Sequence, residues 1–167
     1  MPVHSSATIE IDKKYLKFSA AHFTIFSATE RERLHGHNFS VGVSVTAAVD
    51  ENGMCFDYRE LKSRVQSLCE ELDEYTLLPA QSPFLRITEH EEHYLAEFNG
   101  ETLRFAKPDT KLLPVRNTTV EEYSRYLLSR LLEDRAFFGP DRVESVVLKV
   151  SSAPGQYGVA CWSADAR

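Results

Sequence analysis

The sequence predicts an α+β fold, in which a mainly antiparallel sheet carries two helices on one of its faces. Three observations lead to this prediction. Apolar and polar residues alternate within the first fifty positions, two later segments repeat their apolar residues with helical spacing, and two short β-rich segments close the chain. A chain of 167 residues is of the size of one domain, so residues 1–167 are treated as a single domain.

The first part of the predicted sheet comes from residues 8–20 and 38–49. In the second segment, every other residue from Phe39 to Val45 is apolar, as expected for a strand with one buried face. The dipeptide Asn52-Gly53 is a strong hairpin signal, and it predicts a short third strand at residues 54–56.

Two amphipathic helices are predicted from apolar residues at steps of three and four. The first begins after Asp57, a favourable N-cap, with Glu60 in the position that completes a capping box. The second runs from residue 119 to about 132, with Thr118 as its cap and Glu121 three residues later. Their apolar faces consist of Tyr58, Leu61, Val65, Leu68 and Leu72, and of Tyr123, Leu127, Leu128, Leu131 and Leu132.

Further strands are expected between and after the helices. Residues 84–107 have strand character and contain a second hairpin at 98–101. The segment Gly139-Pro140-Asp141 ends the second helix, and residues 143–150 and 156–162 give two closing strands.

Composition excludes several classes of protein. Lys and Arg number 19 against 25 Asp and Glu, and this net charge of −6 argues against a nucleic-acid partner. No apolar run has the ~20 residues of a membrane-spanning helix, and the first residues lack a secretory signal. The odd number of cysteines and their wide spacing disfavour a disulfide framework and favour a cytoplasmic location; they are Cys55, Cys69 and Cys161.

The histidines suggest a metal site. His35 and His37 are two residues apart at the start of a predicted strand, so both imidazoles point to the same face. His22 closes the preceding strand and reaches this pair if the two strands are neighbours. Three neutral imidazoles suit Zn²⁺ and leave a fourth position open, although the spacing is equally compatible with unrelated histidines. The remaining histidines stand in polar segments and are expected to be solvated; they are His4, His90 and His93.

Three segments carry a resemblance to a known family. They read Phe18-Ser19-Ala20-Ala21-His22, then Leu34-His35-Gly36-His37-Asn38-Phe39, then Phe56-Asp57-Tyr58-Arg59-Glu60-Leu61-Lys62. Together they resemble the 6-pyruvoyltetrahydropterin synthase family, which includes the 6-carboxytetrahydropterin synthases of queuosine biosynthesis. The resemblance covers most of the chain except an inserted hairpin at about 80–116.

The resemblance implies a tunnelling fold, with an antiparallel four-stranded sheet and two helices in each subunit. It also implies trimeric rings that can stack into hexamers, and active sites shared between subunits. It assigns Zn²⁺ to His22, His35 and His37, and it makes dihydroneopterin triphosphate or a related reduced pterin the substrate.

The chain departs from the family pattern at the catalytic residues. The family cysteine before the His-Gly-His motif is missing, and one branch of the family has a glutamate at the position of Glu32. Glu32 is therefore a candidate base, or else a solvated loop charge. Where many members have an Asp-His pair, this chain has Asp73 and Glu74, which keep the carboxylate but not the imidazole. Asp73 is either a catalytic residue or the solvated end of the first helix.

The substrate-binding residues also differ. Family members anchor the pterin ring with a glutamate in the penultimate strand, which has no carboxylate here, and Ser152 or Val150 falls nearest to that position. The Thr119 and Glu121 pair matches a Thr-x-Glu pattern of the family, although a helix cap explains it as well. Losing a charge-assisted bidentate contact would weaken recognition of a pterin.

The sequence leaves a leading function and two alternatives. The leading one is a zinc-dependent lyase acting on a reduced pterin, as a homo-oligomer without nucleic-acid or membrane partners. The first alternative keeps the metal but acts on a different heterocycle or polyol. The second is a catalytically silent zinc-containing scaffold.

Overall fold

The computed structural model describes residues 5–134, 136–138 and 142–165, and the predicted break at 139–141 lies outside this part. The strands are β1 (Ser6–His22), β2 (His35–Ala48), β3 (Tyr75–Pro79), β4 (Arg86–Glu89), β5 (His93–Phe98), β6 (Glu101–Ala106), β7 (Thr110–Leu113), β8 (Val143–Ala153) and β9 (Gln156–Ser163). The helices are α1 (Tyr58–Leu72) and α2 (Val120–Leu132), with one turn of 3-10 helix at Lys107–Asp109.

The main sheet has six strands in the order β7-β3-β1-β2-β8-β9, so the prediction of four antiparallel strands was wrong. The four central and C-terminal strands β1, β2, β8 and β9 are antiparallel neighbours. β3 and β7 add a parallel extension, which joins β1 only at Ala20 and Ala21. These two strands are short and follow no alternating pattern long enough to identify them from sequence.

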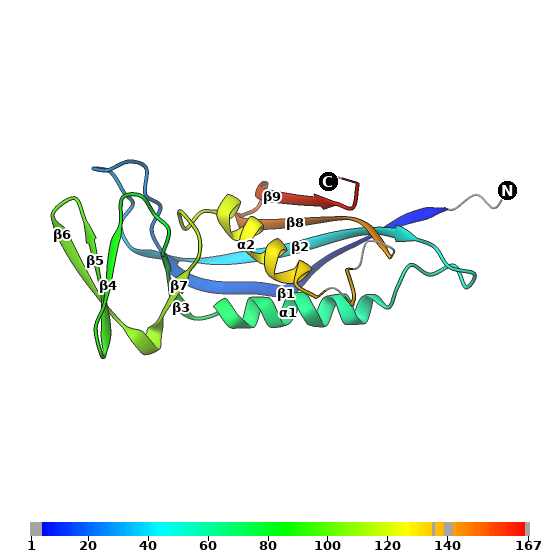
Figure 1. The fold of residues 1–167 in the computed structure, drawn as a ribbon, viewed down its shortest axis with the longest axis horizontal. Coiled ribbons are helices and arrows are strands. Elements are labelled where there is room, and N and C mark those ends of the chain that lie inside the picture. Colours follow the sequence, from blue (N-terminus) through cyan, green and yellow to red (C-terminus); the bar gives the residue numbers. More distant parts are fainter. Residues whose placement is uncertain (1–4, 135, 139–141, 166–167) are drawn as a thin grey trace.

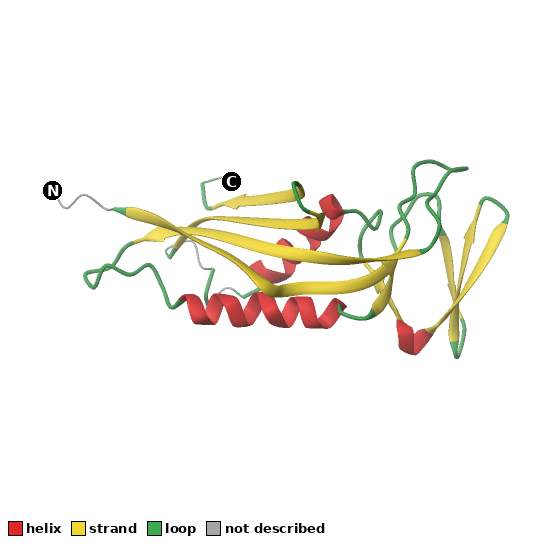
Figure 2. Ribbon diagram, turned by 180° about the vertical axis from the view of Figure 1, so that it is seen from behind, coloured by secondary structure: helices red, strands yellow, loops and turns green. Residues whose placement is uncertain are grey.

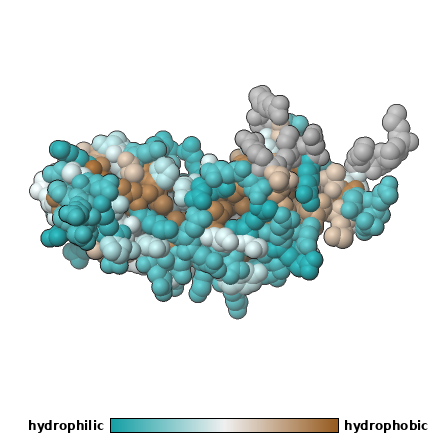
Figure 3. Space-filling view, turned by 60° about the horizontal axis from the view of Figure 1, so that its bottom comes forward, coloured by the Kyte–Doolittle hydropathy of each residue, from teal (hydrophilic) through white to brown (hydrophobic). Residues whose placement is uncertain are grey.

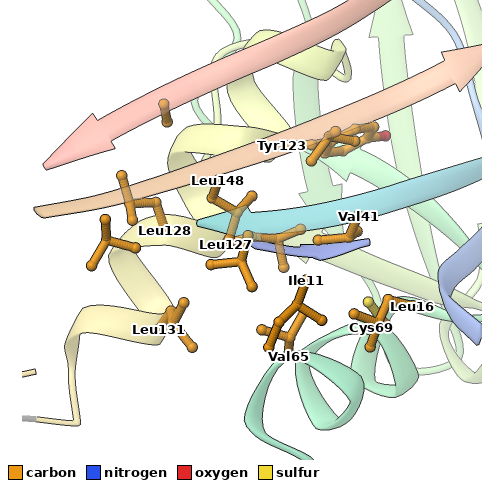
Figure 4. Packing of buried hydrophobic residues seen from close by; sticks show 14 of the residues in the cluster. Ile11, Leu16, Val41, Val65, Cys69, Tyr123, Leu127, Leu128, Leu131 and Leu148 are labelled. Atoms are coloured by element: carbon orange, nitrogen blue, oxygen red, sulfur yellow. The ribbon is translucent and has the colours of Figure 1, made fainter. Parts of the chain in front are cut away.

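Both helices lie on one face of this sheet, as predicted (Figure 2). Figure 4 shows side chains of α1 and α2 meeting those of the strands, among them Val65, Leu127, Val41 and Leu148. The buried face of α1 consists of Leu61, Val65, Cys69 and Leu72, whereas Tyr58 is exposed. Burial of this apolar surface is the main force that holds the helices to the sheet.

The ends of the helices differ in part from the predictions. Asp57 is the N-cap of α1, and its carboxylate accepts the N–H of Arg59. Glu60 binds Arg64 instead of closing a capping box. In α2 the cap is Thr119, one residue later than predicted, because the side chain of Thr118 is buried elsewhere.

The predicted strand at 54–56 is not formed. Asn52-Gly53 does form a turn, but the carboxylate of Asp50 closes it by accepting the N–H groups of Asn52 and Met54 at 2.8 and 2.9 Å. The chain then leaves β2, because Phe56 is buried in the core just before α1 begins.

The region predicted to be an inserted hairpin contains a small three-stranded sheet in the order β4-β5-β6, one strand more than the predicted hairpin. That this region is an insertion stays a prediction. The turn at 98–101 joins β5 to β6 as expected. Figure 1 places this small sheet at the end of the molecule opposite the N-terminus. It has a core of its own, formed by Phe23, Ile25, Leu78, Leu85, Ala96, Phe98 and Phe105.

Neither α-helix of the described part of the chain is long and apolar enough to cross a bilayer. Figure 3 shows a face that is mostly hydrophilic, with hydrophobic residues gathered along its length. Several large apolar side chains are exposed on the single chain, including Phe26, Leu34, Phe84 and Tyr157.

Candidate metal centre

Three histidines converge where β1 ends and β2 begins. In the antiparallel pairing, His22 is opposite His35, and Ala20 is opposite His37. Because alternate residues of a strand share a face, the three imidazoles stand on the helix-covered face with Phe39. One possible ligand nitrogen from each ring lies within 4.8 Å of the others. The structure thus brings together the three residues that the sequence singled out.

Backbone carbonyl groups orient two of these rings. Nδ1 of His22 donates to the carbonyl oxygen of Thr118 at 2.8 Å, and Nδ1 of His35 donates to that of Arg33 at 2.7 Å. A carbonyl oxygen only accepts, so Nδ1 carries the hydrogen in both rings and Nε2 is the nitrogen that can bind a metal ion. In His22 this Nε2 lies 2.9 Å from Nδ1 of His37, which brings two of the candidate ligand rings into direct contact. Metal-binding histidines are usually held in this way by their second nitrogen.

The protonation of His22 also suits a metal ligand. Burial lowers the pKa of this imidazole, and the neighbouring rings of His35 and His37 lower it further, against the opposing effect of the Thr118 carbonyl. A neutral imidazole is the form that binds a metal ion. Three such nitrogen donors with no thiolate beside them fit Zn²⁺ with one position open for another ligand.

Glu32 lies next to this group of histidines. Its Oε2 is 3.9 Å from Nε2 of His35 and accepts the N–H of Thr24 at 2.8 Å. Burial raises the pKa of the Glu32 carboxyl, but the Thr24 hydrogen bond and the rings of His35 and His22 outweigh it, so the pKa is lowered. Glu32 is therefore an ionised carboxylate at neutral pH, held in place beside the candidate metal ligands.

Asn117, which no sequence pattern singled out, and Thr118, predicted only as a helix cap, hold the loop between β1 and β2. The side chain of Asn117 bonds both the N–H and the carbonyl of Ile25, at 3.1 and 2.8 Å. The hydroxyl of Thr118 donates to the carbonyl of Phe23 at 2.7 Å. Their position just before α2 resembles an ordinary helix start, so no local signal distinguishes this role.

Asp73 and Glu74 lie at the junction of α1 and β3. Asp73 is the C-cap of α1, and its carboxylate accepts the N–H of Ser19 at 2.6 Å. Glu74 has a φ of 65°, and its N–H donates to the carbonyl of Ser19. Glu74 and His37 both line a pocket of about 330 Å³. No hydrogen bond joins either carboxylate to the histidines among the described residues, so their catalytic role stays a prediction.

The three predicted substrate-binding residues lie apart from one another. Thr119 and Glu121 are at the start of α2, where the hydroxyl of Thr119 accepts the N–H of Glu122 at 3.4 Å. Ser152 is near the end of β8, accepts a hydrogen bond from Gln156 and lines a hollow of about 490 Å³ together with Lys149 and Tyr157. Their contact with a substrate stays a prediction.

Comparison with known proteins agrees with this geometry. The family model described as 6-pyruvoyl tetrahydropterin synthase matches residues 10–159. The chain belongs to this family. Members of this family are lyases that bind small-molecule substrates. The family is therefore one of enzymes.

Relatives in this family include both proteins of known structure and proteins known by sequence. A Methanocaldococcus jannaschii protein, provisionally named 6-carboxy-5,6,7,8-tetrahydropterin synthase, is 26% identical over 152 residues, which cover 84% of this chain and 86% of that protein. The 6-pyruvoyl tetrahydropterin synthase of Plasmodium vivax superposes with a TM-score of 0.90 at 28% identity, covering 95% of this chain and 99% of the other. Two variants of the Plasmodium vivax enzyme, with a catalytic glutamate replaced by alanine or cysteine, superpose equally well.

Proposed function

We propose that the chain is a zinc-dependent lyase of the 6-pyruvoyl- or 6-carboxytetrahydropterin synthase type, acting on dihydroneopterin triphosphate or a related reduced pterin. The observation that carries the proposal is the ionised carboxylate of Glu32, 3.9 Å from His35 within a group of three convergent imidazoles. The description of a catalytic glutamate in the Plasmodium vivax enzyme supports the same role here.

Different residues are proposed to bind the metal ion and to transfer protons. His22, His35 and His37 would hold Zn²⁺. When bound, the ion polarises oxygen atoms on the substrate side chain and makes the adjacent carbon–hydrogen bonds more acidic. Glu32 would remove a proton from such a carbon, and the hydrogen bond that it accepts from the Thr24 N–H holds its carboxylate beside His35. Asp73 and Glu74 are proposed as further proton carriers.

The open edges of the sheet support the proposal of a homo-oligomer. β9 is an outer strand, and β1 pairs with β3 only at Ala20 and Ala21, so among the described residues most of the outer edge of β1 has no strand beside it. Unpaired strand edges of this length are normally covered. A ring in which β9 of one subunit pairs with β1 of the next would cover both.

The decisive experiment uses the purified, zinc-loaded protein. Dihydroneopterin triphosphate is added and products are followed by mass spectrometry, with Glu32→Gln as the matched variant that keeps shape and removes the charge. We expect turnover by the native protein and a loss of at least about 100-fold in the variant. No product with zinc fully bound would reject the pterin substrate.

A changed substrate is the second candidate, and Ser152 favours it. The position where the family has a ring-anchoring glutamate has a hydroxyl, which here bonds only Gln156 among the described residues. Turnover of another heterocycle or polyol, with none of the pterin, would support this candidate. Intact metal binding together with wild-type behaviour of Glu32→Gln in every assay would instead indicate a silent scaffold.

A further inference from the structure

The inserted sheet β4-β5-β6 is built onto the loop that carries Glu32. Phe23 and Ile25, from the start of this loop, belong to the same buried cluster as Ala96, Phe98 and Phe105 of the insertion. The residue that follows the metal ligand His22 is thus part of the core of the insertion. Because close-packed cores transmit displacements, movement of the small sheet moves the loop.

Arg31 makes the most specific connection between the two parts. Its guanidinium lies 5.1 Å from the ring centre of Phe23 and 5.7 Å from that of Phe98. Its Nη2 forms an ion pair of 2.8 Å with Glu101 at the start of β6. Only 15% of the Arg31 side chain is exposed, whereas 65% of the Glu101 side chain is exposed, so the Arg31 side of this ion pair is the one shielded from water.

The other end of the same guanidinium holds the backbone of Glu32. Nη1 of Arg31 donates to the carbonyl oxygen of Glu32 at 2.9 Å. The loop then closes on itself, because Glu32 N–H donates to the carbonyl of Thr24 and Thr24 N–H donates to the Glu32 carboxylate, both at 2.8 Å. Ile25 and Arg31 form the isolated bridge beside this pair.

We propose that Arg31 is a positioning residue, through which the inserted sheet fixes the carboxylate of Glu32 beside His35. The proposal rests on the proposed catalytic role of Glu32 and adds a function for the insertion, which becomes a supporting part of the active site. A carboxylate that must meet one carbon–hydrogen bond depends strongly on its placement, and small displacements cost large factors in rate.

The test compares two ion pairs. One joins Arg31 of the loop to Glu101 of the small sheet, and the other joins Glu89 of the same sheet to Lys107. Arg31→Met removes the charged contacts, and Glu101→Gln removes only the ion pair across the junction. Glu89→Gln is the control, because it breaks the Lys107–Glu89 ion pair of 2.6 Å, which lies within the insertion. Glu89 and Glu101 are matched in exposure, at 64% and 65%. If Arg31→Met does not fold, Arg31→Lys is measured in its place, because lysine keeps the positive charge.

We expect Arg31→Met to lower kcat by about 10- to 100-fold with KM changed less, and Glu101→Gln to have a smaller effect in the same direction. Combined with Glu32→Gln, Arg31→Met should cause no further loss, because it acts through that carboxylate. Hydrogen exchange of the Thr24 amide should be faster in Arg31→Met and unchanged in Glu89→Gln.

Three results would overturn the proposal. They are a kcat within twofold of the native value in Arg31→Met, an equal loss in the Glu32→Gln background, and Thr24 exchange no faster than in the control. If the native protein converts no pterin, the proposed function fails, and the exchange of the Thr24 amide alone decides whether Arg31 positions the loop.

Discussion

Nδ1 of His22 lies 2.8 Å from the carbonyl oxygen of Thr118, which joins the end of β1 to the residue before the α2 cap. The same threonine holds Phe23 through its hydroxyl. The orientation of a candidate metal ligand therefore depends on the position of the first turn of α2, and predictions about that turn test the site.

The packing of α2 on β9 requires a glycine at position 158. A Cβ atom built there would lie 2.2 Å from the carbonyl oxygen of Val120. Gly158→Ala must push the start of α2 outwards, so we expect a loss of about 1–3 kcal/mol in unfolding free energy. Zinc affinity should fall as well, because Thr118 moves with the helix. Urea denaturation and zinc titration measure the two effects.

Gly42→Ala is the control for this substitution. Its Cβ would meet the carbonyl of Ile11 at 3.7 Å, an ordinary contact, so stability should stay within about 1 kcal/mol of the native value. Equal effects at both glycines would contradict the close approach of α2 and β9.

Thr118→Val should lower the stability more than Thr119→Val, although Thr119 and not Thr118 is the N-cap of α2. Thr118→Val leaves the buried carbonyl of Phe23 without its partner, which costs about 1–3 kcal/mol. Thr119→Val removes an N-cap whose hydrogen bond is long, at 3.4 Å, and should cost about 0.5–1 kcal/mol. Denaturation curves of the two variants give the order directly, and a larger loss at Thr119 would contradict the buried hydrogen bond between Thr118 and Phe23.

Metal removal should lower thermal stability only while the histidines are intact. A ligand present at 100 times its dissociation constant stabilises the folded state by about 2.7 kcal/mol. We therefore expect a chelator to lower the Tm of the native protein and to have little effect on His35→Ala. His93→Ala is the control, since His93 of β5 stacks on His90, and it should respond to the chelator like the native protein. An unchanged native Tm would argue against a bound ion.

Cys69 should be chemically inert in the folded protein. Burial raises the pKa of its thiol to about 12, with smaller contributions from Asp73 and Glu70. Since a raised pKa keeps the thiol protonated, only a very small fraction is thiolate at pH 8. Iodoacetamide labelling followed by peptide mass spectrometry should leave Cys69 unmodified in buffer and modify it in urea. Rapid labelling in buffer would show that α1 opens.

Much of the fold was predictable because apolar residues repeat at regular intervals along its longest helices and strands. β1, β2, β8, β9 and both α-helices bury one face each, so their apolar residues repeat every second residue or every three to four. β3 and β7 were not predictable, because short strands added to a sheet edge depend on neighbours distant in sequence. The strand expected at 54–56 was lost to the burial of Phe56, a tertiary effect that the turn signal does not contain.

The sequence by itself determined the residue types of the site: three histidines placed to share one face, and a glutamate three residues before the second of them. Only the tertiary structure decided how they are held. The contacts of Thr118 with His22, of Asn117 with Ile25 and of Arg31 with Glu101 join segments that are 70 or more positions apart. No local pattern specifies such contacts, because the folding of the whole chain brings those segments together.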